Sequence, residues 1–212
     1  MKKVSIISLL MVLAFAATGQ EIQTLFGSPR PSGAYAGLSN KFTTINGDYA
    51  NMAEIYGGWF IKRKFMIGIG AAATTNNISV PMKYSTDPTR KMSWQYGQFG
   101  LMTEYSFGST RVIHLNFSLF SGAGFTAQYE RHDWDDWDDW DDHDYDDDDI
   151  KHDANFFYVM EPGVQVELNV LKWMRLSPGI SYRKTFGSDA IGLNDKALSD
   201  VSYNVTLKFG KF

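Results

Sequence analysis

The chain has 212 residues, of which 44% are hydrophobic, 21% charged and 15% aromatic, so it fits one folded domain and is too apolar for a wholly disordered protein. It has no cysteine, which excludes disulfide scaffolds, thiolate zinc sites and cysteine nucleophiles. The net charge of −4 hides two opposite parts, because residues 131–153 hold thirteen aspartates against one arginine and one lysine, a net −11. The remaining basic charge is scattered, so nucleic acid is not an expected partner.

The first twenty residues have the organisation of a secretory signal. Lys2 and Lys3 precede an apolar run from Val4 to Ala17, and the small residues Ala17 and Gly19 follow at the spacing that a signal peptidase needs. The run is short for a membrane-spanning helix, which needs about 20 residues. We therefore expect residues 1–20 to be a Sec-type signal peptide and residues 21–32 a short periplasmic lead-in.

From Gly33 to the end, apolar and polar residues alternate with the period of a β-strand. In the clearest case, Ile113 to Tyr129, Leu115 and Phe117 share one face while His114 and Asn116 share the other. Each alternating segment is long compared with the usual five or six residues of a soluble strand. We predict strands in eight segments: 33–44, 52–61, 65–71, 98–107, 113–129, 156–168, 175–183 and 201–209.

The polar faces of these segments carry ionisable residues of both signs, which suits a narrow lumen where they can pair. These residues are Lys41, Glu54, Glu104, Glu161, Glu167, Arg175, Arg183 and Lys208. The apolar faces then need lipid or a second sheet, because no helix is predicted to cover them. A secreted soluble β-protein remains the alternative, since half-buried strands alternate there too.

The predicted connections sort by length as in an outer-membrane barrel, with short periplasmic turns and longer outer loops. Short links occur at 62–64, 108–111 and 169–173. Long loops are expected at 75–92, 130–153 and 187–198, and only the first hairpin, at 46–49, is short where a long loop is expected. We therefore predict an all-β fold, an eight-stranded antiparallel up-and-down transmembrane β-barrel over residues 33–212.

The chain resembles the small eight-stranded outer-membrane barrels of the OmpA/OmpX-like, Bacteroidota-type family. The resemblance lies in the segments 178–183 (PGISYR) and 201–212 (VSYNVTLKFGKF), and the terminal aromatic Phe212 resembles the signal that barrel-assembly machinery reads. Phe212 departs from the pattern, because it has the opposite parity to the apolar positions 201–209. The resemblance implies the bacterial outer membrane, with lipid, lipopolysaccharide and the assembly machinery as partners, but it implies little about activity.

The acidic loop at 130–153 repeats the triplet Trp-Asp-Asp, which matches neither a strand nor a regular helix. The loop is either a solvated charged surface or a weak multi-ion site, since carboxylates are ligands for Ca²⁺ or Mg²⁺. His132, His143 and His152 are a weaker alternative, a transition-metal site without helix-face spacing. The candidate cation ligands are Asp133, Asp135, Asp136, Asp138, Asp139, Asp141, Asp142, Asp144, Asp146, Asp147, Asp148 and Asp149.

An enzyme and an open pore are both disfavoured. Serine hydrolysis needs a histidine beside the serine, but the only histidine outside the acidic loop, His114, falls at the periplasmic end, and we expect it to face the lumen. Glu161 and Glu167 are expected to pair with Arg175 or Arg183. Bulky residues should fill the narrow interior: Tyr35, Tyr56, Met66, Tyr96, Met102 and Phe120.

The sequence thus predicts no catalytic residues and no cofactor other than calcium. The expected function is a non-enzymatic outer-membrane barrel whose acidic loop serves cation-dependent or adhesive surface contact and envelope integrity. A lipid-modifying or hydrolytic barrel enzyme is the alternative, alongside the soluble β-protein. The surface ligand is not identified by the sequence.

Overall fold

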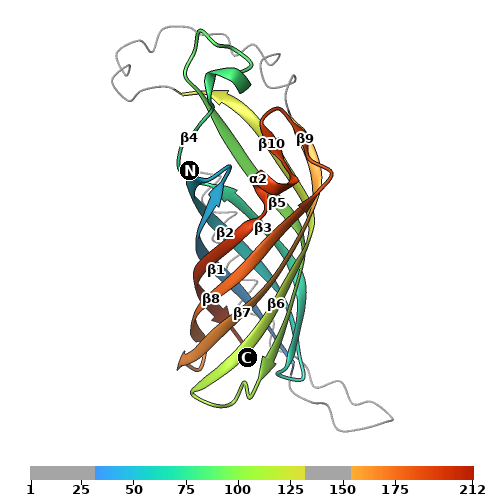
Figure 1. Cartoon of the computed structure of the whole chain (residues 1–212). Helices are drawn as coiled ribbons and strands as arrows, with labels where there is room; N and C mark the ends of the chain where they lie inside the picture. The colour runs from blue at the N-terminus through green and yellow to red at the C-terminus, as the bar shows by residue number, and fades with distance from the viewer. Residues whose placement is uncertain (1–31, 132–153) are drawn as a thin grey trace, which may run out of the picture.

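A computed structural model describes residues 32–131 and 154–212, and eight long antiparallel strands dominate it (Figure 1). Their bounds are β1 Gly33–Ile45, β2 Asp48–Ile61, β3 Phe65–Thr74, β5 Met92–Phe107, β6 Ile113–Glu130, β7 Asn155–Leu171, β8 Met174–Phe186 and β11 Asp200–Gly210. Each strand pairs with its neighbours along the chain, β1 pairs with β11, and β3 pairs with β5. The sheet therefore closes, and the predicted eight-stranded up-and-down barrel is confirmed.

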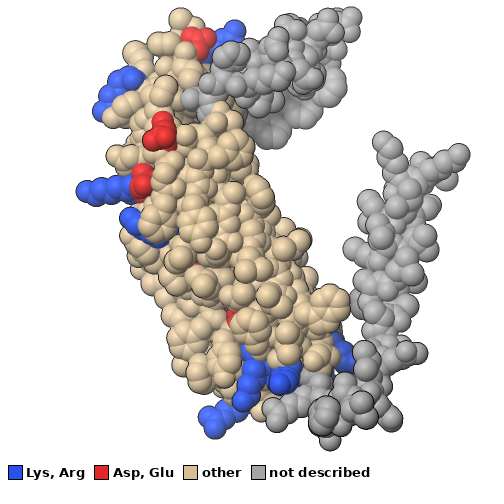
Figure 2. Space-filling view, turned by 90° about the vertical axis from the view of Figure 1, so that its right-hand side faces the viewer, with Lys and Arg blue, Asp and Glu red and all other residues tan. Residues whose placement is uncertain are grey.

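Side chains alternate between the two faces of every long strand, as the sequence predicts. In β11, Tyr203, Val205 and Leu207 are exposed while Ser202, Asn204, Thr206 and Lys208 are buried. Apolar side chains elsewhere are equally open, and Ile69 is 74% exposed. A band of uncharged side chains covers the middle of the face in Figure 2, with charged groups at both ends. Soluble monomers rarely expose so continuous an apolar surface, so this band belongs in lipid.

The buried face holds all eight ionisable side chains that the alternation assigned to the lumen, four acidic and four basic. The predicted bulky residues are buried with them, from Met66 and Tyr96 at 0% exposure to Tyr35 at 5%. Glycines make room for these large groups. A Cβ added to Gly37 on β1 would lie 2.6 Å from the ring carbon Cζ of Tyr56.

Turn lengths differ between the two ends of the barrel. The connections between β2 and β3, β5 and β6, and β7 and β8 are short and lie at the end where the chain terminates (Figure 1). By the rule for outer-membrane barrels this is the periplasmic end. At the other end the first hairpin closes on Asn46 and Gly47, both at positive φ, and the remaining connections are long.

The outer loops contain more regular structure than predicted. β5 begins at Met92, six residues before the predicted start, and the preceding loop contains β4 Ile78–Ser79 and the 3₁₀ helix η1 Met82–Tyr84. The expected loop 187–198 contains β9 Asp189–Ala190, β10 Leu193–Asn194 and α2 Asp195–Leu198. These short elements were missed because each is too brief for its alternation or helical period to show.

The last residues bend into the barrel. The ring of Phe212 lies 5.1 Å from that of Tyr35, a lumen residue, and the Arg175 guanidinium lies 3.7 Å from its centre. The opposite parity of Phe212 therefore has a structural reason, because this aromatic residue closes the periplasmic end of the lumen while positions 203, 205 and 207 face outward.

None of the helices in residues 32–131 and 154–212 is long and apolar enough to span a bilayer. Residues 1–31 lie outside the described residues, so the signal peptide and most of the lead-in stay predictions.

Candidate functional site

Two glutamates in the periplasmic half of the lumen share one lysine. Lys208 Nζ on β11 lies 2.8 Å from Glu104 Oε2 on β5 and 2.8 Å from Glu167 Oε2 on β7. Arg175 Nη1 on β8 lies 2.5 Å from Glu167 Oε1. All four side chains are at most 5% exposed. Two positive and two negative charges thus balance in a space closed to water, which is the condition under which a buried ion pair is tolerated.

Neutral donors complete this cluster. The hydroxyl groups of Tyr35 and Tyr56 donate to the Glu104 carboxylate, and the Tyr56 bond measures 2.8 Å. Asn116 Nδ2 on β6 lies 3.2 Å from Glu104 Oε2 and 3.0 Å from Glu167 Oε2. Most of the carboxylate oxygen lone pairs are therefore occupied, and the network joins every long strand except β3. This periplasmic cluster therefore links strands across the lumen and has a structural role.

His114 belongs to the same cluster, in the position that the sequence predicts. Its Nε2 lies 3.0 Å from Glu167 Oε1, and its Nδ1 lies 3.2 Å from the backbone oxygen of Arg111. The side chain is fully buried. Both ring nitrogens face these two oxygens, so neither is placed to activate a serine hydroxyl.

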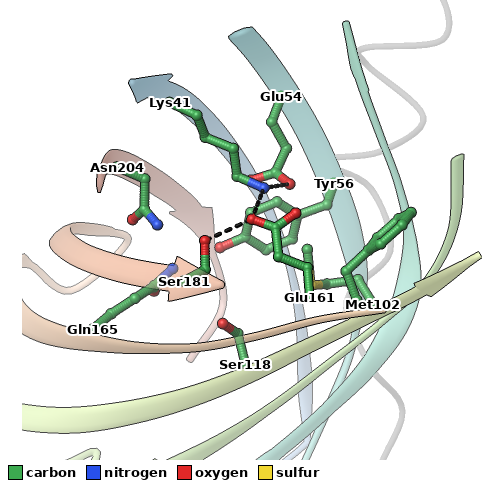
Figure 3. Close-up of a pocket in the computed structure, with 10 residues that line it drawn as sticks. Lys41, Glu54, Tyr56, Met102, Ser118, Glu161, Gln165, Ser181 and Asn204 are labelled. Carbon is green, nitrogen blue, oxygen red and sulfur yellow. Dashed lines mark hydrogen bonds and ion pairs between the residues drawn. The ribbon is translucent and has the colours of Figure 1, made fainter. Parts of the chain in front are cut away.

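A second cluster is built around Lys41 (Figure 3), which lies opposite Asn204, four residues from Lys208 along β11 toward the outer end. Lys41 Nζ lies 2.7 Å from Glu54 Oε1 and 2.9 Å from Glu161 Oε1. Ser181 donates to Glu161 Oε1 at 2.6 Å, and Gln98 donates to its other oxygen at 3.0 Å. The expected pairing of Glu161 with an arginine is wrong, because Lys41 reaches it across the lumen, whereas Glu167 does pair with Arg175.

The free space beside this cluster is small. A cavity of about 10 Å³, roughly the room that one water molecule needs, is lined by Glu54, Glu161, Met102 and Phe120 among others. The side-chain oxygens of Gln165 and Asn204 also line it and have no hydrogen-bond partner among the described residues. The interior at this level is packed and does not form a channel.

Arg183 closes the lumen toward the outer end. Its Nε donates to the Leu198 backbone oxygen at 2.7 Å, and its Nη2 donates to the Thr44 backbone oxygen at 2.9 Å. The guanidinium also lies 4.8 Å from the ring centre of Tyr96. The sequence offered Arg183 as a partner for a glutamate, but no such pair forms among the described residues. Arg183 instead links the last outer loop to the barrel.

That loop, residues 187–199 with β9, β10 and α2, forms what we call the outer cap. Leu193 and Leu198 are completely buried, together with Ile45 and Ile78 from other outer segments. The backbone N–H of Asn46 donates to the Ala197 oxygen at 2.7 Å. The outer cap thus adds a small apolar core above the charged lumen, and its sequence signal, isolated leucines between polar residues, was too weak to predict it.

The other outer loops are held by polar contacts. Arg131 Nη2 donates to Ser79 Oγ at 2.9 Å, and Gln128 Nε2 donates to the Tyr84 backbone oxygen at 2.8 Å. Hydrogen bonds from the Thr89 side chain and backbone lower the pKa of Asp87. These contacts hold the outer loops next to the acidic loop. The acidic loop begins where β6 ends, at Glu130, and leads to β7, which begins at Asn155.

The predicted cation ligands, Asp133 to Asp149, and the three loop histidines lie outside the described residues. Within residues 32–131 and 154–212, no three His, Asp or Glu side chains are grouped so as to hold a metal ion. The structure therefore brings together the lumen residues that the sequence singled out, and the metal assignment stays a prediction.

Neither a family model nor a curated protein matches this chain. Solved structures do. The crystal structure of Neisserial surface protein A aligns with a TM-score of 0.55 at 10% identity, over 85% of this chain and 97% of that one. A major outer membrane protein from Thermus thermophilus aligns with a TM-score of 0.49 at 7% identity, over 84% of this chain and 98% of that one.

The N-terminal β-barrel domain of Pseudomonas aeruginosa OprF aligns with a TM-score of 0.47 at 9% identity, over 84% of this chain and 96% of that one. At such identities a likeness concerns the fold alone, and the first of the three carries it. Together with strand closure and the apolar outer band, it agrees with the resemblance found in the sequence. By its fold, the chain is a small eight-stranded outer-membrane β-barrel.

Proposed function

We propose that this chain is a non-enzymatic barrel that holds an acidic loop at the outer surface for cation-dependent or adhesive contact. The observation that carries the proposal is the position of the residues on either side of the acidic loop. Arg131 donates its backbone N–H to the Lys91 oxygen at 2.9 Å, and Asn155 accepts from the Asp189 N–H at 3.2 Å. Both flanks are thus anchored at the end of the barrel opposite the short turns.

The lumen supports the same proposal. Its ionisable side chains are engaged in ion pairs or hydrogen bonds, and its free volume near Glu161 holds about one water molecule. A barrel filled in this way serves as a rigid support. We expect planar-bilayer recordings of the refolded protein to show no large stable conductance, and lipase and protease screens to be silent.

The charge of the acidic loop supports a cation-dependent contact. Thirteen aspartates within residues 131–153 repel one another, and divalent cations lower that repulsion through carboxylate coordination. Envelope integrity, through contacts with lipopolysaccharide and with neighbouring lipid, belongs to the same proposal, as does insertion by barrel-assembly machinery.

Calcium titration tests whether the acidic loop binds cations. The refolded chain should change its tryptophan emission at millimolar calcium, because three of its six tryptophans lie between the aspartates at 134, 137 and 140. Replacing the twelve aspartates from Asp133 to Asp149 with asparagine should abolish the response while those tryptophans remain. A matched control changes Asp87 and Asp189, acidic residues of other outer loops, and should respond as the wild type does.

An unchanged spectrum at millimolar calcium would rule out cation binding by the acidic loop. Surface display has its own test, protease accessibility of the acidic loop in intact cells. Cleavage confined to broken cells would place the loop on the periplasmic side and contradict the proposal.

A further inference from the structure

The periplasmic end of the barrel carries exposed basic side chains, and none of the described residues in its turns is an Asp or Glu. Three short turns and the chain end supply the basic side chains, and we call the set the basic rim: Lys62, Arg63, Lys64, Arg111, Lys172 and Lys211. None of the six forms an ion pair within the part of the chain that the structure describes. Figure 2 shows Lys and Arg gathered at the lower end of the molecule, whereas both signs occur at the upper end.

Large apolar side chains adjoin the basic rim in sequence and point outward. Phe65 follows Lys64 at 39% exposure, Val112 follows Arg111 at 71%, and Trp173 follows Lys172 at 56%. The basic groups therefore lie where the lipid-facing band ends, at the depth of the lipid headgroups.

The turn between β2 and β3 has basic residues at two positions where the backbone conformation disfavours a side chain. Lys62 and Arg63 both have positive φ, 53° and 55°, where glycine and asparagine fit best. The outer hairpin of the same barrel uses Asn46 and Gly47 at this geometry. A strained backbone at a site of charge points to a role for the side chains themselves.

The backbone of the basic rim is fixed. Ser109 Oγ donates to the Arg63 oxygen at 2.5 Å, which links two neighbouring turns. Asn169 Nδ2 donates to the Arg111 oxygen at 2.6 Å, which links the second turn to β7. The basic groups are thus distributed around the barrel on a rigid frame, and they do not converge on one compact site.

We infer that the basic rim binds the phosphate groups of anionic phospholipids in the periplasmic leaflet. Basic side chains at a membrane surface attract anionic lipid individually. A ring of separate charges at headgroup depth matches many lipids at once, whereas a soluble phosphate compound requires convergent donors. This binding fixes the depth of the barrel in the membrane and surrounds it with anionic lipid in the periplasmic leaflet. It does not depend on what the outer loops contact.

Spin-labelled lipids test this on the whole mature chain. In bilayers of phosphatidylcholine with phosphatidylglycerol, electron spin resonance measures how strongly each labelled lipid is motionally restricted by the barrel. We expect the wild type to prefer phosphatidylglycerol roughly twofold to fivefold at low salt, since each basic side chain near the membrane surface attracts an anionic headgroup. High salt should reduce the preference.

The test variant changes Lys64, Arg111, Lys172 and Lys211 to glutamine and leaves the strained pair in place, so folding should persist. A control removes four outer basic charges instead, at Lys83, Arg90, Lys184 and Lys196. The preference should fall markedly in the first variant, which keeps only Lys62 and Arg63 of the basic rim, and should persist in the second.

Equal restriction of both lipids by the wild type, or an unchanged preference in the rim variant, would overturn the inference. Inorganic phosphate is compared with sodium chloride at equal ionic strength, and stronger competition by phosphate would indicate a soluble-anion site instead. Rim-dependent binding to isolated peptidoglycan without a lipid preference would also contradict it.

Discussion

Lys208 shows how single residues hold this barrel together. Its ammonium group lies between two carboxylates that would otherwise repel each other in a space closed to water. Desolvation makes an unpaired buried charge costly, whereas a paired and hydrogen-bonded one is tolerated. The interior therefore depends on complete pairing more than on the number of ion pairs.

Replacing Lys208 with methionine should lower the free energy of unfolding by about 3–5 kcal/mol, because Glu104 and Glu167 lose their shared counter-charge. Urea unfolding in lipid vesicles, followed by tryptophan emission, measures the loss. Lys196→Met on the exposed outer cap is the matched control and should change stability by about 0.5 kcal/mol or less. A Lys208 variant as stable as this control would contradict the assigned role.

Residue parity was predictable from the sequence, but partners across the lumen were not, and of the expected pairs only Glu167 with Arg175, on neighbouring strands, is present. Alternation along one strand is enough to place Lys41, Glu161 and Arg183 in the lumen. Which of them meet depends on how strands far apart in sequence are staggered around the barrel. Glu161 therefore pairs with Lys41 from the first strand, while Arg183 reaches backbone oxygens.

Among the elements, the β2–β3 turn carries strain that the first hairpin avoids. Changing Lys62→Asn together with Arg63→Gly should stabilise the barrel by about 1–2 kcal/mol, since left-handed backbone is unfavourable for residues with a Cβ. The same urea unfolding experiment measures the gain.

The reciprocal change, Asn46→Lys with Gly47→Arg, places the same residues in the outer hairpin and should destabilise by a similar amount. Equal stability of both double variants and the wild type would show that these positive φ values carry no strain.

The outer cap should open independently of the barrel. Asp195 holds it closed, because its carboxylate accepts from the backbone N–H groups of Gly187 and Ser188 at 3.1 and 2.8 Å. Asp195→Ala should speed proteolytic cleavage within 187–194 several-fold while the strands stay protected, because local opening needs only a few contacts to break. Mass spectrometry of the fragments identifies the cut.

Asp189→Ala is the control for that measurement. Asp189 is exposed on β9, and its carboxylate has no hydrogen-bond partner in the described parts of the chain. Cleavage that rises equally in both variants would mean that the Asp195 contacts do not hold the outer cap.

Long strands were predictable because their outward positions meet lipid and must be apolar. That signal fades where β5 rises above the apolar band, since its outward positions there are no longer uniformly apolar, as at Gln95. The first six residues of β5 were therefore left outside the predicted strand. The outer cap was missed for a related reason, because its two-residue strands and four-residue helix are fixed by contacts with Arg183 and Asn46 and not by local pattern.

At the scale of the whole molecule, insertion into a membrane requires that apolar side chains face hydrocarbon while charged ones face a closed interior. The absence of cysteine in the sequence allows single labels to be introduced without other changes. Strand β11 is the best place for them, because exposure alternates at successive positions from 202 to 208.

The most direct test is therefore lipid quenching along β11. Tyr203→Cys, Asn204→Cys, Val205→Cys and Thr206→Cys are each labelled with a small fluorophore in urea and refolded into vesicles containing brominated lipid. We expect strong quenching at 203 and 205 and little at 204 and 206, with heat-modifiable gel mobility confirming the folded barrel. Uniform quenching, or quenching at 203 and 205 by aqueous iodide instead of brominated lipid, would contradict it.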